Sequence, residues 1–268
     1  MSSLLDPWLS AAAVVFILVT LLWLVSLRIR DVSIIDSFWS LGFVVSAWIY
    51  RSQGGEASPA QWLHLGLVTL WGVRLAAHIA WRHAKHGEED PRYQAMRRRT
   101  GDAFRWTSLV KVFWLQAALI CVIAAPLLWT QAGTRVNGGA LAPWVWTDAL
   151  AVVLFAIGFA FEAGGDWQLT KFRDDPSNRG KVLRTGFWAW TRHPNYFGDA
   201  VIWWSFGVAA LGSVGGVYTL PASILMTFLL LKVSGVALLE KDIAERRPKY
   251  RDYIESTPAF FPRPPSRR

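Results

Sequence analysis

The sequence contains little cysteine and little charge, and each shortage excludes a class of protein. One cysteine, Cys121, occurs in 268 residues. A disulfide framework is therefore excluded, and a thiolate-bound metal is disfavoured. Charged residues make up 18% of the chain and hydrophobic residues 53%, whereas a soluble domain carries about a quarter charged residues. The composition favours a protein embedded in a lipid bilayer.

The apolar residues are gathered into runs of about twenty, the length of an α-helix that crosses about 30 Å of hydrocarbon. The 17 Trp residues agree with this reading, because Trp favours the membrane–water interface. We predict an all-α integral membrane protein, a bundle of seven transmembrane helices that forms a single domain over residues 1–268. The predicted spans are residues 8–27, 33–50, 61–81, 109–129, 143–163, 197–218 and 220–240.

The basic residues predict the orientation of this bundle. Segments 28–32, 82–107 and 164–196, together with the tail from residue 241, hold 23 of the 28 Lys and Arg residues. Because Lys and Arg collect on the cytoplasmic side of membrane proteins, the N-terminus is predicted outside and the C-terminus in the cytosol. The net charge of +9 then predicts contact with membrane lipid. We expect no nucleic acid and no obligate protein partner.

Ionisable residues inside membrane spans are costly and usually mark functional sites. Eight of them lie in the predicted cytosolic half of their spans, which indicates a polar chamber open to the cytosol. A transporter would need polar groups at the midplane with access from both sides, so transport is disfavoured. Helix ends whose side chains reach water are the alternative for some members. The eight are Asp36, Arg74, His78, Lys111, Glu162, Asp199, Lys232 and Glu240.

Asp36 on the second span is predicted to face the pair Arg74 and His78 on the third span. Asp36 shares a helix face with Ser33 and Ser40, and Arg74 shares a face with His78, four residues later. An acid that faces an Arg/His pair has two interpretations: a buried ion pair that fixes helix packing, or a group that polarises the carbonyl of a substrate. The residues alone leave both open.

Residues 159–199 combine acids, amides and bases in one segment. The helical pattern of the fifth span continues to about Arg173 and places Glu162, Asp166 and Arg173 on one face. Pro176 then interrupts the helix. Pro194 suits the first position of the next helix, because its missing N–H costs nothing there.

The predicted helix that begins at Pro194 offers an anion site. The free backbone N–H groups of Asn195 and Tyr196 lie at its N-terminus, a position that favours phosphate. Asn195 and Asp199 are four residues apart and suit a carboxamide or ribose hydroxyl groups. The sequence has neither a G-x-G-x-x-G fingerprint nor a Walker loop. An ordinary cytosolic loop is the alternative. Nearby bases are Lys181, Arg184 and Arg192.

The C-terminal tail has two interpretations of equal weight. Its first part is predicted to leave the membrane as a helix, and its four prolines predict an extended end. The tail either closes over a nucleotide or lies on anionic lipid. The polar residues that support the first interpretation are Glu240, Arg246, Arg247, Lys249 and Tyr250.

Three motifs resemble the steroid 5-alpha-reductase family, in particular its bacterial membrane proteins. They are the segment RHPNYFGD at residues 192–199, the segment GFW at 186–188, and the Phe-Phe-Pro near the end of the chain. The resemblance is good over residues 159–262 and thin elsewhere. It implies a seven-span helical fold, residence in the bacterial plasma membrane, and a cofactor site that faces the cytosol. The implied reaction is NADPH-dependent reduction of the 4,5 double bond of a 3-oxo-4-ene steroid.

The resemblance also implies roles for individual residues. Asp36 takes the place of the acid that contacts the steroid 3-oxo group. The family's Tyr on the third span is absent, and Trp71 lies at roughly that place. We predict Asp36, Trp71 and His78 as catalytic residues, with no metal. Together with the anion site, the resemblance assigns to NADPH the residues Glu162, Asp166, Arg173, Lys181, Arg192, His193, Asn195, Tyr196, Asp199, Lys232, Glu240, Arg246 and Tyr250.

Three other functions are weighed against this reductase. A methyltransferase of the isoprenylcysteine type, which uses S-adenosylmethionine, also has an Arg-His-Pro helix entrance, but its sulfonium cofactor has no phosphate for the surrounding bases to neutralise. A non-catalytic sterol or lipid binder with the same scaffold is the second alternative. A haem or metal enzyme is disfavoured, because the close pair His83 and His86 lies in a basic loop.

Overall fold

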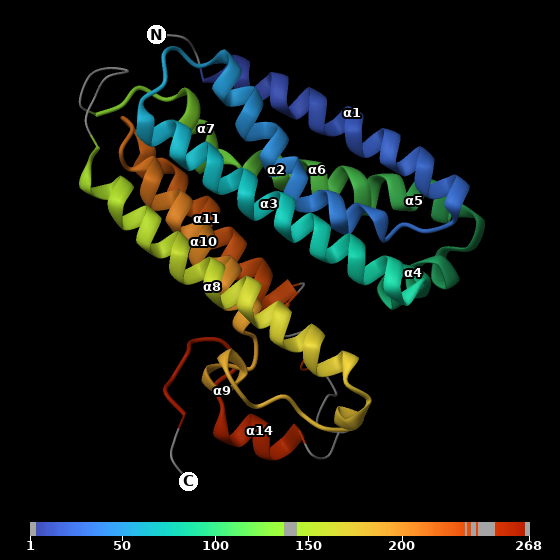
Figure 1. Cartoon of the computed structure of the whole chain (residues 1–268). Coiled ribbons are helices and arrows are strands. Elements are labelled where there is room, and N and C mark those ends of the chain that lie inside the picture. The colour runs from blue at the N-terminus through green and yellow to red at the C-terminus, as the bar shows by residue number, and fades with distance from the viewer. Residues whose placement is uncertain (1–3, 137–143, 234, 237–239, 241–249, 266–268) are drawn as a thin grey trace. The chain divides into compact units, whose positions relative to one another are not determined.

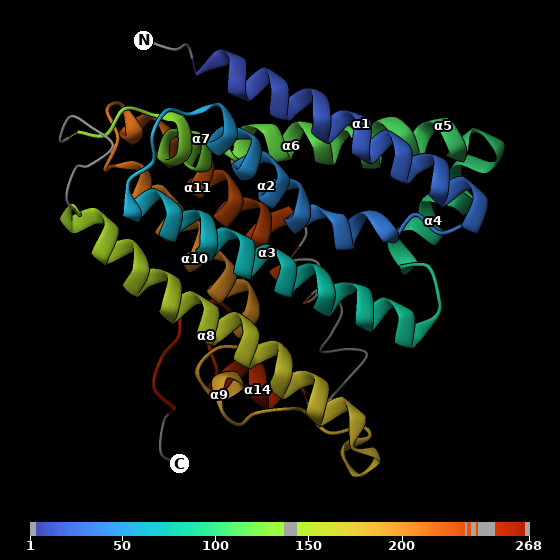
Figure 2. The ribbon, with the colours of Figure 1, turned by 45° about the horizontal axis from the view of Figure 1, so that its top comes forward.

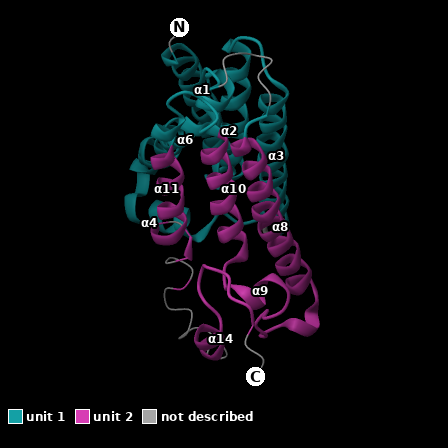
Figure 3. Cartoon of the chain, turned by 90° about the vertical axis from the view of Figure 1, so that its left-hand side faces the viewer, with its two compact units in different colours: residues 1–145, 210–219 teal, residues 146–209, 220–268 magenta. Residues whose placement is uncertain are grey.

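The computed structural model describes residues 4–136, 144–233, 235–236, 240 and 250–265. Helices form all the regular elements of these ranges, which confirms the all-α expectation (Figure 1). The chain divides into two compact units, coloured separately in Figure 3. Unit 1 comprises Met1–Val145 and Ala210–Thr219, and unit 2 comprises Trp146–Ala209 and Leu220–Arg268. The prediction of a single domain is not tested by this division.

Unit 1 is built around α2, which packs against α1 and α3 in both ribbon views (Figures 1 and 2). The Ser40 hydroxyl of α2 donates a 2.8 Å hydrogen bond to the Gly72 carbonyl of α3, so the two helices approach closely at that level. The helices of unit 1 are α1 (Leu5–Ile29), α2 (Ile34–Gln53), α3 (Pro59–His86), α4 (Pro91–Thr100), η1 (Gly101–Ala103), α5 (Phe104–Ser108), η2 (Leu109–Trp114), α6 (Leu115–Ile123), α7 (Ala125–Ala132) and η4 (Gly216–Thr219).

The ends of α3 follow from local sequence. Ser58 and Gln61 form a reciprocal capping box, and Pro59 occupies the first turn. At the other end Gly87 takes a left-handed conformation, with φ of 69°, and its N–H closes the helix on the His83 carbonyl. The sequence therefore fixes both ends of this 28-residue helix.

The fourth predicted span, residues 109–129, overlaps a run of successive helices that begins earlier, at Pro91. It contains the π-helical turn η2, in which each turn holds more residues than in an α-helix. Lys111 lies in η2, and Lys232 lies in the second π-helical turn, η5 (Leu229–Val233) of unit 2. Both lysines were singled out as charges inside apolar spans.

Unit 2 is organised by the crossing of α8 (Trp146–Asp174) and α10 (Pro194–Ala210). A Cβ atom on Gly198 would lie 2.4 Å from both the Glu162 nitrogen and the Gly158 oxygen. Only glycine therefore permits this approach of the two backbones. The remaining helices of unit 2 are η3 (Pro176–Asn178), α9 (Phe187–Trp190), α11 (Leu220–Phe228), η5 and α14 (Arg251–Ser256).

Within the described residues, five helical segments are long and apolar enough to cross a membrane. The outward face of α1 shows the expected lipid-facing character, because Ile17, Leu21 and Leu24 are each more than half exposed. The protein is thus an all-α protein with helices compatible with integration into a membrane. Helices also occupy the second and sixth predicted spans, as α2 and α10, but seven crossings and their orientation stay predictions. The five segments are Leu5–Ile29, Pro59–Lys85, Pro91–Ile123, Trp146–Asp174 and Gly216–Val233.

Candidate functional site

Each unit contains a polar cluster that includes some of the predicted site residues. In unit 1 the centre is Asp36, in the first turn of α2. The Tyr93 hydroxyl lies 2.6 Å from Asp36 Oδ1, and an Arg92 guanidinium nitrogen donates to Oδ2 at 2.9 Å. The side chain of Gln116 on α6 also hydrogen-bonds to Asp36. We call Asp36, Arg92 and Tyr93 the Asp36 cluster.

The short helix α4 supplies both Arg92 and Tyr93, and the loop before it is fixed to the start of α2. The Asp90 N–H donates to the Ser33 hydroxyl at 2.7 Å, and the Val32 N–H donates to the Glu89 carboxylate at 3.0 Å. Asp90 caps α4. Burial opposes its ionisation, but hydrogen bonds from Arg92 outweigh burial and hold the pKa of this carboxyl below its usual range. Tyr93 is therefore placed by several interactions, although it belongs to a connecting segment.

The other two predicted catalytic residues lie on α3. Trp71 is fully buried, with its ring 6.2 Å from that of Phe43. The His78 ring lies 6.3 Å from the Trp81 ring. The partners that the structure gives Asp36 come instead from α4 and α6. A phenol hydroxyl does contact Asp36, but it belongs to Tyr93 of α4, which sequence reasoning missed, and not to a residue of the third span. The available signal was the Asp90-Pro91 helix start, which puts Tyr93 in the first turn of a helix.

In unit 2 the prediction that the helix of the fifth span continues to about Arg173 is confirmed, because α8 runs to Asp174. Glu162 and Asp166 are both buried on it. The prediction that Pro194 begins a helix is confirmed by α10. The Asn195 side-chain amide donates to Asp166 Oδ1 at 3.1 Å, so two of the predicted cofactor residues are joined.

Glycines and a tryptophan set the position of this pair. A Cβ on Gly165 would lie 3.3 Å from the Asn195 nitrogen, so α8 runs close beside the first turn of α10. The Trp188 indole of α9 donates to the Gly165 carbonyl at 3.0 Å. Because Gly165 has no side chain, α10 can approach α8 at this level, and the approach brings Asn195 within hydrogen-bonding distance of Asp166.

Arg192 and Glu240 form a bidentate ion pair, with distances of 2.7 and 2.8 Å. His193 Nε2 lies 3.0 Å from the same carboxylate. The Glu240 carboxylate thus lies between two adjacent side chains, those of Arg192 and His193. Arg192 also donates to the carbonyl groups of Ile254 and Thr257. Four of its five N–H donors are thus used within the chain.

The C-terminal residues 250–263, which we call the C-terminal clasp, form hydrogen bonds with residues 188–192. The Arg192 N–H donates to the Pro258 carbonyl at 2.9 Å, and the Arg263 N–H donates to the Trp190 carbonyl at 3.0 Å. The Tyr253 hydroxyl donates to the Trp188 carbonyl, and burial raises the pKa of Tyr253, so it stays a donor. After Ser256 the proline-containing end of the tail is non-helical and contains bends.

The remaining predicted cofactor residues differ in exposure. Arg173 and Lys181 are exposed in unit 2, and so is Lys232 on η5. Tyr196 and Asp199 are half-buried, and the Tyr196 ring lies 5.9 Å from that of His193. Tyr250 is buried, with its ring 5.2 Å from that of Tyr253. Arg246, Arg247 and Lys249 lie outside the described residues. All these ligand assignments stay predictions.

The fold and its clusters define a class: an all-α protein with membrane-compatible helices and acidic residues paired with phenol, amide and guanidinium groups. Its residues 22–257 match the family model described as a protein of unknown function, DUF1295, and the chain belongs to that family. It is 26% identical to an uncharacterized protein of Schizosaccharomyces pombe over 286 aligned residues, which cover 96% of this chain and 80% of the yeast protein. No solved structure matches.

Proposed function

We propose that the protein is an NADPH-dependent reductase of the carbon–carbon double bond of lipophilic enones, with 3-oxo-4-ene steroids as the first class to test. The observation that carries the proposal is the 2.6 Å contact between the Tyr93 hydroxyl and Asp36. It supplies the phenol that the family resemblance requires beside the acid. The motif at residues 192–199 and the Asn195–Asp166 hydrogen bond support the cofactor half of the proposal.

Reduction of an enone places negative charge on the carbonyl oxygen while hydride adds to the β-carbon. A donor already aimed at that oxygen stabilises the transition state, typically by a few kcal/mol. In the Asp36 cluster, Tyr93 and Arg92 both donate toward the Asp36 carboxylate. We assign to Tyr93 the hydrogen bond to the substrate oxygen, and to Asp36 and Arg92 the positioning of that hydroxyl before substrate binds. Because a phenol has a single O–H, this proton turns from Asp36 to the substrate oxygen when the enone binds, while Arg92 keeps its hydrogen bond to the Asp36 carboxylate.

The residues of unit 2 fit a nucleotide cofactor by their chemistry. The Asn195 carboxamide can donate hydrogen bonds to, and accept them from, amide and ribose hydroxyl groups, and the buried Asp166 carboxylate can accept hydrogen bonds from them. Arg173 and Lys181 are exposed cations suited to phosphates. Bound NADPH would supply the hydride. Arg192 and Glu240 are engaged with each other and with the C-terminal clasp, so we assign them a positioning role at this site.

Purified protein in detergent provides the direct test. Thermal shifts measured with NADPH and with S-adenosylmethionine separate a reductase from a methyltransferase, and stabilisation by the second alone would contradict the proposal. NADPH oxidation with testosterone-like and progesterone-like enones then tests turnover, with Asp36→Ala as the inactive control. A non-catalytic lipid binder would bind the enone without oxidising NADPH. Asn195→Ala should weaken NADPH binding.

We further propose seven crossings in the plasma membrane, with the N-terminus outside and the cofactor residues facing the cytosol. The distribution of Lys and Arg supports this orientation. Because Cys121 is buried and is the only cysteine, Cys121→Ala gives a simple background for labelling. In that background Glu56→Cys should react with an impermeant maleimide in intact cells, whereas Asp175→Cys should react only after lysis. Both positions are exposed. The reverse pattern would invert the proposed orientation.

A further inference from the structure

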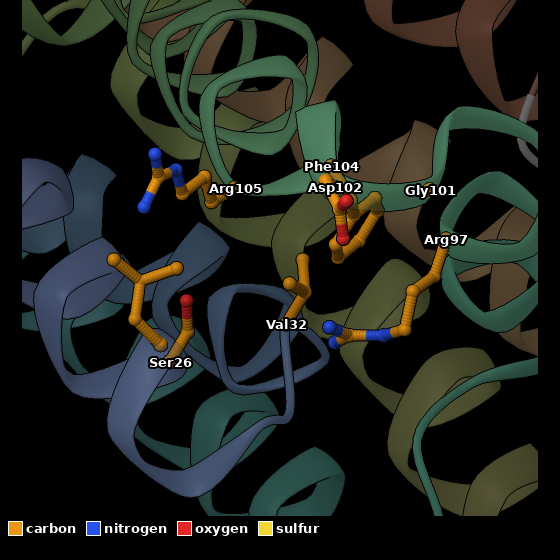
Figure 4. Close-up of a pocket in the computed structure, with 8 residues that line it drawn as sticks. Ser26, Val32, Arg97, Gly101, Asp102, Phe104 and Arg105 are labelled. Carbon is orange, nitrogen blue, oxygen red and sulfur yellow. The ribbon is translucent and has the colours of Figure 1, made fainter.

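A pocket of about 390 Å³ in unit 1 lies where the end of α1 meets α4 and α5, and no residue of the Asp36 cluster lines it (Figure 4). Its lining combines two cations, one acid and apolar groups. Figure 4 shows Arg97 and Arg105 on different sides of the opening, with Val32 and Phe104 between them. The lining residues used below are Leu27, Val32, Arg97, Asp102, Phe104 and Arg105.

The two arginines differ in how they are held. Arg97 is fixed by the Glu89 carboxylate at 2.7 Å, and its guanidinium lies 4.2 Å from the centre of the Phe104 ring. Arg105 is exposed, its guanidinium lies over the ring of Trp106 at 5.6 Å, and within the described parts of the chain it has no ion pair. One cation is thus preset, and the other is accessible to an anion.

The surroundings of the pocket are those of a membrane interface. Trp106 is more than half exposed, and its ring lies 5.4 Å from that of Trp23; tryptophan at such a position is typical of the headgroup region. Ile17, Leu21 and Leu24 form one exposed apolar face along α1. Leu27, three residues after Leu24, lines the pocket. An acyl chain on this face would therefore end at the two arginines.

We propose that this pocket binds a glycerophospholipid whose headgroup carries an N–H or O–H donor, such as phosphatidylethanolamine or phosphatidylglycerol. The single negative charge of the phosphodiester faces Arg97 and Arg105, because guanidinium groups bind phosphate oxygens well. Asp102, which is exposed in the same lining, accepts the headgroup donor and disfavours a more highly charged anion. Phosphatidylcholine has no such donor and is expected to bind less well.

The test uses the full chain purified in detergent, with each lipid added in turn. Native mass spectrometry should show phosphatidylglycerol and phosphatidylethanolamine bound, and each should raise the melting temperature by several degrees more than phosphatidylcholine. Arg105→Gln should remove at least half of this shift. Its fold is not at risk, because the backbone carbonyl of Arg105, and not its side chain, accepts the Trp23 indole N–H. Asp102→Asn should narrow the preference for phosphatidylethanolamine over phosphatidylcholine.

Arg98→Gln is the matched control, because Arg98 is exposed on α4, carries the same charge and does not line the pocket. It should retain the full lipid shift. An equal loss in Arg98→Gln and Arg105→Gln would show diffuse attraction to the basic surface and would overturn the proposal. Equal shifts with phosphatidylcholine would also overturn it, as would inorganic phosphate alone reproducing the full shift.

Discussion

The polar clusters of the two units use their charged groups differently. In the Asp36 cluster, one carboxylate receives two donors from a single short helix, and the side chains of Arg92 and Asp36 are 45% and 26% exposed. In unit 2, Arg192 is 7% exposed, and it is bound by a carboxylate and two carbonyl groups. A cation that uses most of its donors within the chain serves the fold. A cluster that is still exposed stays accessible to a ligand, so we place the substrate donor in unit 1.

The largest effect is expected at Tyr93, where the comparison predicts a loss of catalytic activity in a protein that still folds. Tyr93→Phe removes one hydroxyl, and loss of a donor to a developing oxyanion lowers kcat by about 100-fold or more. Steady-state NADPH oxidation with a 3-oxo-4-ene steroid measures this. Tyr218→Phe is the control, because Tyr218 is 80% exposed, and its activity should be unchanged. A Tyr93→Phe enzyme with wild-type kcat would remove Tyr93 from the mechanism.

A substitution of Arg192 should act in the opposite way, mainly by lowering the stability of the folded protein. Arg192→Gln removes the charged donor that binds the Glu240 carboxylate and two backbone carbonyl groups. Breaking a buried ion pair of this kind lowers the free energy of unfolding by about 3 kcal/mol. We expect a lower melting temperature and rapid trypsin cleavage at Arg251, which is exposed at the start of α14. Arg179→Gln, at an exposed position of the same unit, should match the wild type. Wild-type protease resistance in Arg192→Gln would disprove the clasp.

The helix crossing in unit 2 gives a smaller, purely steric test. Gly198→Ala places a Cβ 2.4 Å from backbone atoms of α8, and overpacking of this kind costs about 1–3 kcal/mol. Denaturation in detergent should show the loss. Gly66→Ala is the matched control in unit 1, because nothing lies within 4 Å of its added Cβ. A neutral or slightly favourable result is expected there, since alanine favours helix. Equal effects at the two positions would contradict the close crossing.

Much of the fold could be predicted because it depends on local signals. The extent of α8 to Asp174, the start of α10 at Pro194 and the non-helical end after Ser256 all follow from helix periodicity and proline. The sequence placed Asp166 and Asn195 in the same predicted site, but it did not predict a hydrogen bond between them. Their hydrogen bond depends on the close approach of α8 and α10, which periodicity does not give.

The missed features are contacts between distant parts of the chain. Tyr93 stands in a segment whose seven basic residues indicated only a cytosolic loop, and nothing local shows that it meets Asp36, 57 residues earlier. Arg192 was predicted as a phosphate ligand because its charge lies beside a helix start. The structure pairs it with Glu240 and the C-terminal clasp, whose partners lie 48 to 65 residues away. Composition identifies such charges but not their partners.

The π-helical turn η2 has a consequence for insertions and deletions. A π turn arises when one extra residue is accommodated within an α-helix, and one residue corresponds to a rotation of about 100°. Deleting a single residue within Leu109–Trp114 would return the segment to regular winding and leave the later side chains of α6 at their present angles, whereas the same deletion in a regular stretch of helix would rotate them. Gln116, which now reaches Asp36, would keep its direction, so η2 is the place where this helix can lose one residue without changing what surrounds the acid.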